Sequence, residues 1–260
     1  IADVQEIVKN AAQTSKQVSI IGAGMSQGVQ TVPIGAEHVV MNLAEINDIT
    51  VDTENNLVTV GAGATWEQVQ LKLDEKGKST IVKQASDPFS VGGTIGMNAH
   101  GWAHRKGAIA STVVSLKMVD AEGNLRTLLR PRPGAPINDL SDDEVLFKCM
   151  FGTMGYFGAI VEATLEIVDN YDVREEMSEC SSADFCKQYS VYKDDKNVPL
   201  LGGRLSLDSL GRNPLTQVCI DRFVKVSEEP SCGRIEAEKE QGTLSDKIAL
   251  KALSHLSTFT

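Results

Sequence analysis

The sequence predicts an α+β fold with one domain over residues 1–170 and a partial α+β domain over residues 171–260. Two observations support this prediction. Through the first part of the chain, segments with helical periodicity alternate with short apolar runs typical of strands. The composition changes near residue 170, because the segment 170–195 is acidic and has no glycine. A chain of 260 residues has the length of one large domain or two modest ones.

The first elements follow from periodicity and capping signals. A helix is expected at the start, where Asp3 and Glu6 have capping-box spacing. Its apolar face would consist of Val4, Ile7, Val8 and Ala11. Strands are expected at 18–21, 38–43 and 57–61. A second capping box, Thr65 with Gln68, predicts a helix that ends at Gly77. Its apolar stripe would be Trp66, Val69 and Leu73.

The later elements are a hairpin, several strands and two helices. Residues 113–119 and 125–129 would pair around the turn at Gly123-Asn124. A surface loop is expected over 130–144 and a short helix over 145–150. Strands are expected at 159–168, 200–207 and 217–226, and an amphipathic helix at 247–256.

Composition excludes several classes of protein. With 42% hydrophobic and 23% charged residues the chain is globular in type rather than disordered or fibrous. A net charge of -10 argues against nucleic acid as the main partner, since Lys and Arg must neutralise phosphates there. No apolar run reaches the roughly 18 residues of a transmembrane helix. The start at Ile1 assigns no compartment, and the oligomeric state is not predicted.

Cysteines and histidines form no recognisable motif. The five cysteines have no C-x-x-C spacing, so we expect free thiols: Cys149, Cys180, Cys186, Cys219 and Cys232. His100 and His104 have a spacing that suits a metal, but no cysteine or carboxylate cluster joins them in sequence. We therefore predict no metal site.

The first glycine-rich segment, Gly22 to Gly28, does not fit a Rossmann loop. The third glycine of that fingerprint falls one residue late, at Gly28, and Pro33 and Gly35 follow where a helix should run. Consecutive backbone N–H groups in such a loop can still form an anion-binding nest without a helix. The alternative is a tight turn with no ligand.

Two further glycine-rich segments change the balance between these alternatives. They run from Ser90 to Gly101 and from Phe151 to Ile160, and both carry hydroxyl or amide donors. Three such loops are more than turn formation requires, so a large ligand held between them is the preferred interpretation. The other interpretation is three structural loops without chemistry.

The ordered set resembles the FAD-binding domain of the vanillyl-alcohol oxidase and p-cresol methylhydroxylase family. The similarity covers residues 1–170 and rests on the three glycine segments and on Val58 to Trp66. The resemblance implies FAD held between two α/β subdomains, with the later part of the chain as a partial cap. The implied cofactor-binding residues are Gly22, Ala23, Gly24, Met25, Ser26, Gln30, Ser90, Gly92, Gly93, Thr94, Gly96, Asn98, Ala99, His100, Gly101 and Ile160.

The chain departs from this family in two ways. Met25 stands where many members place a histidine bonded covalently to the flavin, so non-covalent FAD is expected. The chain is also short for the family, which is consistent with a truncated or degenerate relative.

His100 is the candidate base or hydrogen-bond donor, because imidazole titrates near neutrality. The alternative is that it only bonds the flavin or the backbone. His104, Arg105 and Lys106 could stabilise reduced flavin or an anionic substrate, or form a solvated basic turn. Ala99 would lie beside the flavin and influence access of oxygen. Arg204 could bind a substrate carboxylate or form a surface ion pair.

The predicted function is FAD-dependent transfer of hydride from an alcohol-like or polyol-like small molecule to FAD. One alternative is an FAD-binding protein or fragment without turnover. The other is a nicotinamide-dependent flavin reductase on the same scaffold.

Overall fold

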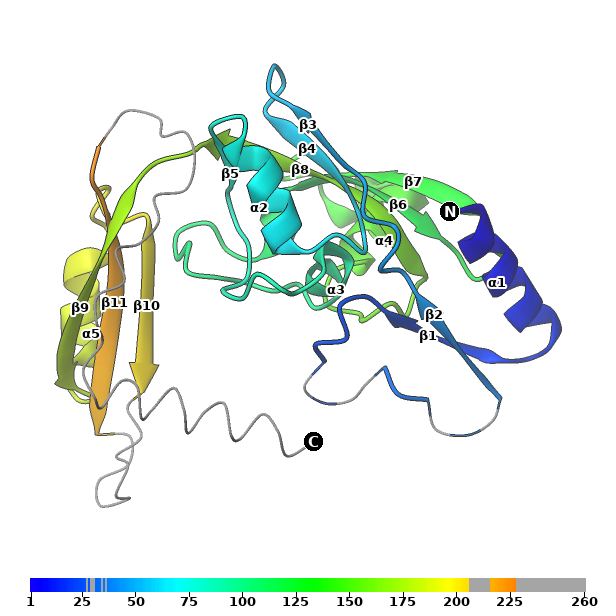
Figure 1. Ribbon diagram of the computed structural model, residues 1–260, viewed down its shortest axis with the longest axis horizontal. Helices are drawn as coiled ribbons and strands as arrows, with labels where there is room; N and C mark the ends of the chain where they lie inside the picture. Colours follow the sequence, from blue (N-terminus) through cyan, green and yellow to red (C-terminus); the bar gives the residue numbers. More distant parts are fainter. Residues whose placement is uncertain (27, 29–30, 34, 36, 206–215, 228–260) are drawn as a thin grey trace.

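The computed structural model describes residues 1–26, 28, 31–33, 35, 37–205 and 216–227, which form three sheets and five α-helices (Figure 1). The smallest sheet is the parallel pair β1 (Gln17–Ile21) and β2 (His38–Asn42). The largest sheet is antiparallel and runs, in order, β3 (Ile49–Asp52), β4 (Leu57–Gly61), β8 (Ala159–Asp169), β6 (Val113–Val119) and β7 (Leu125–Leu129). The short β5 (Lys78–Thr80) also pairs with β8.

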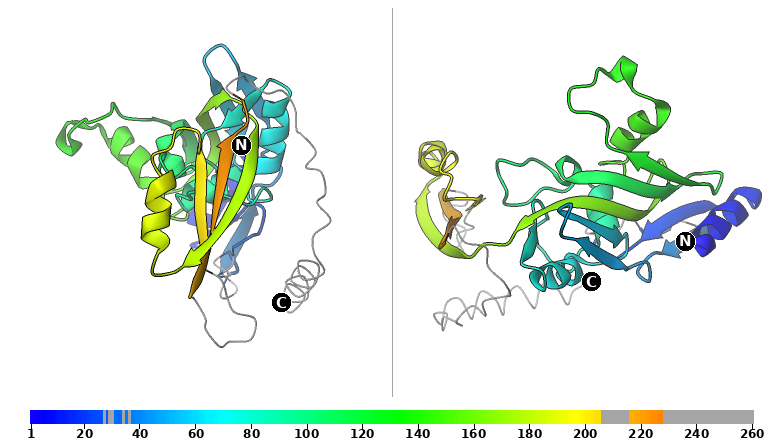
Figure 2. Two further views of the ribbon diagram at one scale, coloured as in Figure 1. Left: turned by 90° about the vertical axis from the view of Figure 1, so that its left-hand side faces the viewer. Right: turned by 90° about the horizontal axis from the view of Figure 1, so that it is seen from above.

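The third sheet is antiparallel and lies at one end of the molecule, with strand order β10 (Leu200–Leu205), β11 (Gln217–Lys225), β9 (Val173–Ser181). The helices are α1 (Ala2–Gln13), α2 (Trp66–Asp74), α3 (Val91–Gly96), α4 (Asp142–Cys149) and α5 (Phe185–Tyr192). Figure 2 shows α2 and α4 on opposite sides of the large sheet and α5 beside the third sheet. Short 3₁₀ helices occupy Ile109–Ser111 and Ile137–Asp139.

The helix predicted from the second capping box is confirmed. The Thr65 hydroxyl accepts the Gln68 N–H, and the Gln68 side chain accepts the Thr65 N–H at 2.9 Å. The stripe Trp66, Val69 and Leu73 is fully buried, as its spacing predicts. The helix ends at Asp74, and Gly77 then takes a left-handed φ of 63°.

The capping box predicted at Asp3 is wrong. Helix α1 begins at Ala2, its N-cap is Ile1, and no side chain caps it. Asp3 therefore lies inside the first turn, where a carboxylate still interacts favourably with the helix dipole. The apolar face is confirmed, because Val4 and Ala11 are buried and Ile7 and Val8 pack against the core.

Several boundaries were predicted well and others were missed. The hairpin over 113–119 and 125–129 has the predicted bounds, and the strands predicted at 18–21, 38–43, 57–61 and 159–168 are present within a residue. The loop over 130–144 ends earlier, because Ser141 and Glu144 form a capping box that starts α4 at Asp142. Strands β3, β5 and β9 and helix α5 were not predicted.

In the C-terminal part, the predicted strands 200–207 and 217–226 correspond to β10 and β11, with residues 206–207 outside the described residues. The predicted helix 247–256 also lies outside them. The domain division near residue 170 stays a prediction.

The two larger sheets are joined by a few defined contacts. The Leu201 N–H of β10 donates to the Trp102 carbonyl at 2.8 Å. The rings of Trp102 and Phe223 meet edge to face with centroids 5.1 Å apart. The Arg105 guanidinium donates to the Asp195 carbonyl at 2.6 Å. The segment after α3 therefore anchors the third sheet.

Disulfides, metal sites and membrane-spanning helices can be considered for the described part of the chain. Cys149, Cys180, Cys186 and Cys219 are free thiols, while Cys232 is not described. Within the described ranges, no three potential ligand side chains gather in a way that could hold a metal ion. Nor does any described helix combine the length and the apolar character that crossing a membrane requires.

Candidate functional site

The three glycine-rich segments meet at one pocket of about 230 Å³. The first segment contributes Gly22 and Ser26. The second contributes Ser90, Gly92, Gly93, Gly96 and Met97. The third contributes Met154, Gly155, Gly158 and Ile160. Segments far apart in the sequence thus share one cavity, which is the arrangement that one ligand held between them requires.

The first segment presents an exposed row of backbone donors. Residues 23–26 are all exposed, and their N–H groups have no hydrogen-bond acceptor within the described residues. Gly24 has a φ of +69°, the left-handed conformation that lets successive N–H groups converge in a nest. Such a nest suits a pyrophosphate, so this segment fits the predicted ligand.

The second segment is not a loop throughout, as expected, because its residues Val91–Gly96 form α3. The low helix propensity of glycine predicts a loop, but tertiary packing overrides it here. The N–H groups of Val91 and Gly92 donate to the carbonyls of Ala64 and Ala62, both at 2.8 Å. A Cβ on Gly92 would lie 2.7 Å from the Ala62 Cβ, so only glycine allows this close contact.

This packing limits which donors of α3 can reach a ligand. The Gly93 N–H has no acceptor within the described residues, and Gly93 lines the pocket. Thr94 is buried and lies outside the lining set, because its hydroxyl accepts the Trp66 indole N–H at 3.1 Å and donates to the Val91 carbonyl at 2.8 Å. Gly93 is thus the donor of α3 that is open to the cavity, and Thr94 orients Trp66.

Residues 98–101, which follow Met97, do not line this pocket. Asn98 has a φ of 49°, and its side-chain oxygen accepts the Ala110 N–H at 3.3 Å. The Ala99 carbonyl accepts the Ile109 N–H at 2.8 Å, and Gly101 packs against the Lys83 carbonyl. His100 is exposed and has no hydrogen-bond partner within the described chain. Their predicted contacts with the flavin stay predictions.

The third segment approaches the pocket through backbone that needs glycine. Gly155 and Gly158 have φ of +83° and +142°, and Gly158 packs directly against the Val119 backbone. Ile160 is 7% exposed and lines the cavity, as its predicted place beside the cofactor requires. Gln30, the remaining predicted residue, lies outside the described residues.

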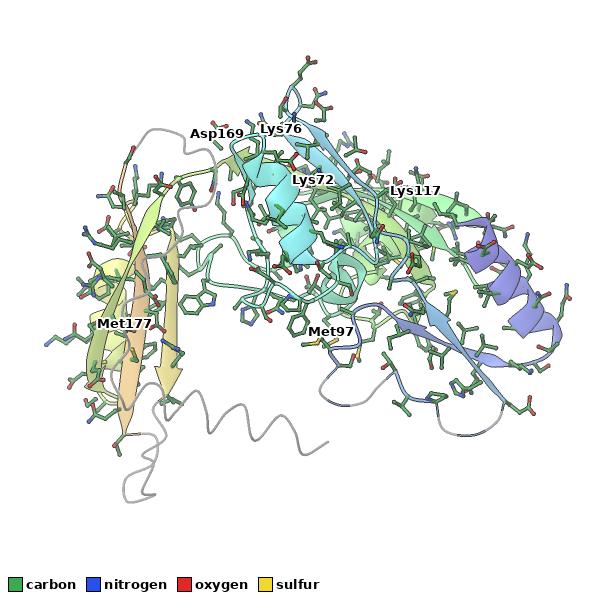
Figure 3. All side chains as sticks on the ribbon, viewed as in Figure 1. Lys72, Lys76, Met97, Lys117, Asp169 and Met177 are labelled. Atoms are coloured by element: carbon green, nitrogen blue, oxygen red, sulfur yellow. The ribbon has the colours of Figure 1, made fainter. Side chains whose placement is uncertain are left out.

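Sequence reasoning missed several lining residues. Ser19, Thr31 and Ala62 reach the pocket from β1, the segment after it and the β4–α2 connection. Met97 and Met154 are 57% and 62% exposed, and Met97 lies on the side of α3 toward β1 (Figure 3). The exposed methionines beside glycine motifs were a signal for apolar lining that could have been used.

The cationic candidates do not line this pocket. His104 Nε2 lies 2.8 Å from the Lys193 carbonyl, and Arg105 also bonds the turn after α5. Arg204 forms a bidentate ion pair with the buried Asp221, at 2.6 and 2.7 Å. That pair and burial of the carboxylate favour the ion-pair interpretation of Arg204.

Comparisons with known proteins agree with this geometry. Residues 1–129 match the family described as FAD binding domain. The chain is 28% identical to L-gulonolactone oxidase of Bos taurus over 176 residues, 67% of this chain and 37% of the relative. It is 27% identical to D-arabinono-1,4-lactone oxidase of Saccharomyces cerevisiae over 196 residues, 74% and 35% of the two chains. Cytokinin dehydrogenase 2 of Arabidopsis thaliana is 26% identical over 212 residues, which are 80% of this chain and 39% of the relative.

The chain thus spans 35–39% of the length of these three relatives. A solved alkyldihydroxyacetonephosphate synthase has a similar fold, with a TM-score of 0.67 at 17% identity over 85% of this chain and 45% of that one. The chain therefore has a mixed α/β fold similar to that of the synthase. The match of residues 1–129 to an FAD binding domain supports FAD as its cofactor. The three relatives are named as two oxidases and a dehydrogenase. Membership of the vanillyl-alcohol oxidase branch stays a prediction.

Proposed function

We propose that this FAD-binding chain is part of an oxidoreductase that transfers hydride from the CH–OH group of an alcohol-like or polyol-like small molecule to FAD. The observation that supports it most is the shared pocket of the three glycine segments, because one elongated cofactor explains all three. FAD supplies the hydride acceptor when bound, and the protein supplies position and electrostatics.

The chain's own residues would divide the cofactor between them. The free N–H groups of residues 23–26 would hold the pyrophosphate, with the Gly93 N–H beside it. Ile160 would contact the adenosine end. Met25 cannot form a histidyl bond, so FAD would be held by non-covalent contacts alone. Each of these roles uses backbone groups, so side-chain identity matters mainly where it controls backbone conformation.

The substrate class is inferred from the names of relatives. L-gulonolactone and D-arabinono-1,4-lactone are hydroxylated lactones, which carry the CH–OH group that the proposal needs. The name cytokinin dehydrogenase denotes a different substrate and makes a cytokinin a necessary comparison compound. The exposed His100 would take the proton from the substrate hydroxyl, and the small Ala99 would leave oxygen access to the flavin.

The cofactor site is tested with a matched pair of glycine variants. Gly24 and Gly35 both have positive φ and no atom closer than 3.7 Å to an added Cβ, but only Gly24 belongs to the row of free N–H groups at the pocket. We expect Gly24→Ala to weaken FAD binding at least about tenfold and Gly35→Ala to leave it unchanged, measured by flavin absorbance after reconstitution. Equal FAD affinity in both variants would contradict the proposal that residues 23–26 bind the cofactor.

Turnover is tested by anaerobic reduction of the bound flavin. Hydroxylated lactones and polyols should bleach the flavin, and His100→Ala should slow bleaching by about 10²-fold or more without loss of FAD. After acid precipitation the flavin should appear in the supernatant, because it is not covalently bound. If only a nicotinamide donor bleaches the flavin, the reductase alternative is supported. If none of the donors bleaches it, the alternative of a protein without turnover is supported.

A further inference from the structure

A second pocket of about 380 Å³ is lined by β5 and the segment after it and by residues of the third sheet. One wall consists of residues 79–81 and 83–85, and Tyr171, Leu200 and Phe223 contribute another. Trp102 and Ala103, which come between these two groups in the sequence, also line the pocket. It shares no lining residue with the pocket of the glycine segments, so the two sites are separate within the described chain.

The walls of this second pocket are unusually aromatic for a chain with 5% aromatic residues. Trp102 and Phe223 meet edge to face, which fixes both rings. Tyr171 is held by the Lys225 ammonium, whose Nζ lies 5.0 Å from the ring centroid. Rigid aromatic walls favour a flat, aromatic ligand, because ring-to-ring contacts add to simple burial.

Gln84, a lining residue of this pocket, carries a donor that lacks an acceptor. Gln84 Oε1 accepts the Ser86 N–H at 2.9 Å, which fixes the orientation of the amide. Its Nε2 is buried and has no hydrogen-bond partner in the described part of the chain. A buried N–H group without a partner is costly, so the site favours a ligand that offers an acceptor.

The charges around the pocket indicate the sign of that acceptor. Lys83 lines the pocket and pairs with Asp87, while no Asp or Glu is among the lining residues. Burial raises the pKa of Tyr171, and the nearby Arg105 partly opposes this rise. Lys83 is thus the charged residue among those that line the pocket, so a negatively charged oxygen is favoured over a positive group.

We propose that this second pocket binds a planar aromatic carboxylate, with the ring against Trp102, Tyr171 and Phe223 and the carboxylate accepting from Gln84 Nε2 close to Lys83. The volume falls in the range of about 300–1,000 Å³ typical of small-molecule sites. Binding here would join the large sheet to the third sheet, because the ligand touches both walls. The inference does not depend on flavin chemistry.

The test is calorimetric titration of the full chain, with and without FAD, using 2-naphthoate as the probe. Cyclohexanecarboxylate has the same charge without an aromatic ring, and 2-naphthol has the rings without the charge. We expect 2-naphthoate to bind at least tenfold more tightly than either. FAD should leave this affinity unchanged, because the two pockets share no residue.

Two variants locate the binding. Gln84→Glu keeps the acceptor for the Ser86 N–H but replaces the amide donor by a negative charge, so 2-naphthoate should bind at least tenfold more weakly while 2-naphthol changes little. Phe223→Leu should weaken both aromatic compounds and leave cyclohexanecarboxylate unchanged. Gln13→Glu, on the exposed end of α1, makes the same charge change away from the pocket and should have no effect.

Three results would overturn the proposal. The first is an affinity for 2-naphthoate that Gln84→Glu does not change, in a variant whose circular dichroism shows an intact fold. The second is equal affinity for cyclohexanecarboxylate, or no binding of any probe. The third is competition by FAD, which would place 2-naphthoate in the glycine pocket. Failure of flavin reduction would contradict the proposed function alone and leave this binding result untouched.

Discussion

The large sheet and the third sheet are both antiparallel, but they are stabilised in different ways. The large sheet and the helices packed on it form one continuous hydrophobic core, with members from Val4 of α1 to Ile167 of β8. Among the residues that the structure describes, the core of the third sheet has four buried hydrophobic residues: Val198, Leu201, Val218 and Ile220. The contacts with Trp102 and the residues that follow it therefore add to the small buried core in stabilising the third sheet.

The same contrast separates the two pockets. The glycine pocket is built from backbone on the large sheet, so its shape is set by glycines and hydrogen-bonded turns. The second pocket is built from side chains at the junction, the region where residues 79–85 and 102–103 meet the third sheet. Its shape therefore depends on how the third sheet is held. The difference teaches that cofactor binding and junction binding can be disturbed independently.

The strongest test of the contrast is removal of Trp66. This side chain is fully buried in the large core, and its indole N–H bonds Thr94. We expect Trp66→Ala to lower the free energy of unfolding by about 3–5 kcal/mol, because a large cavity is left. Urea denaturation followed by far-UV circular dichroism measures this change. Trp66→Phe fills most of the cavity and should cost clearly less.

Removal of Ile220 tests the smaller core. Ile220 is fully buried in β11, and we expect Ile220→Ala to cost about 2–3 kcal/mol, at the low end for such changes, because a thin sheet can relax around the missing atoms. Hydrogen exchange should quicken in β9, β10 and β11 and stay slow in β4, β6 and β8. Equal loss of protection in both sheets would show that they unfold as one unit.

Local signals explain what could be predicted from the sequence. The Thr65 capping box and the Gly123-Asn124 turn act within a few residues, so they specify α2 and the hairpin directly. Helix α3 was missed because glycine forms helix there only through contacts with Ala62 and Ala64. Strand β9 was missed because its run of Glu and Ser residues lacks β-branched or aromatic character.

The candidate site was predictable to the same extent. Backbone loops that need glycine reveal themselves in sequence, so Gly22, Gly93 and Gly155 could be assigned to segments that share a pocket. Ser19 and Thr31 reach the same pocket only through the fold, and no local pattern identifies them. His100 is not among the residues that line this pocket, and its predicted role beside the flavin stays a prediction.

The smallest expected effect concerns Tyr171 at the junction. Burial raises the pKa of its phenol above the ordinary value of 10.0, with Arg105 opposing the shift. The folded protein therefore holds this proton more tightly than the unfolded chain, so the stabilisation is complete below the unfolded pKa and is lost as pH rises through the folded pKa.

The free energy of unfolding should fall more steeply above pH 10.0 than it does in Tyr171→Phe. Ultraviolet titration of phenolate should show one late-ionising tyrosine that is absent from this variant, while Tyr156→Phe, an exposed control, should retain it. If the late phenolate persists in Tyr171→Phe, the junction is more open to water than its packing against Lys225 implies.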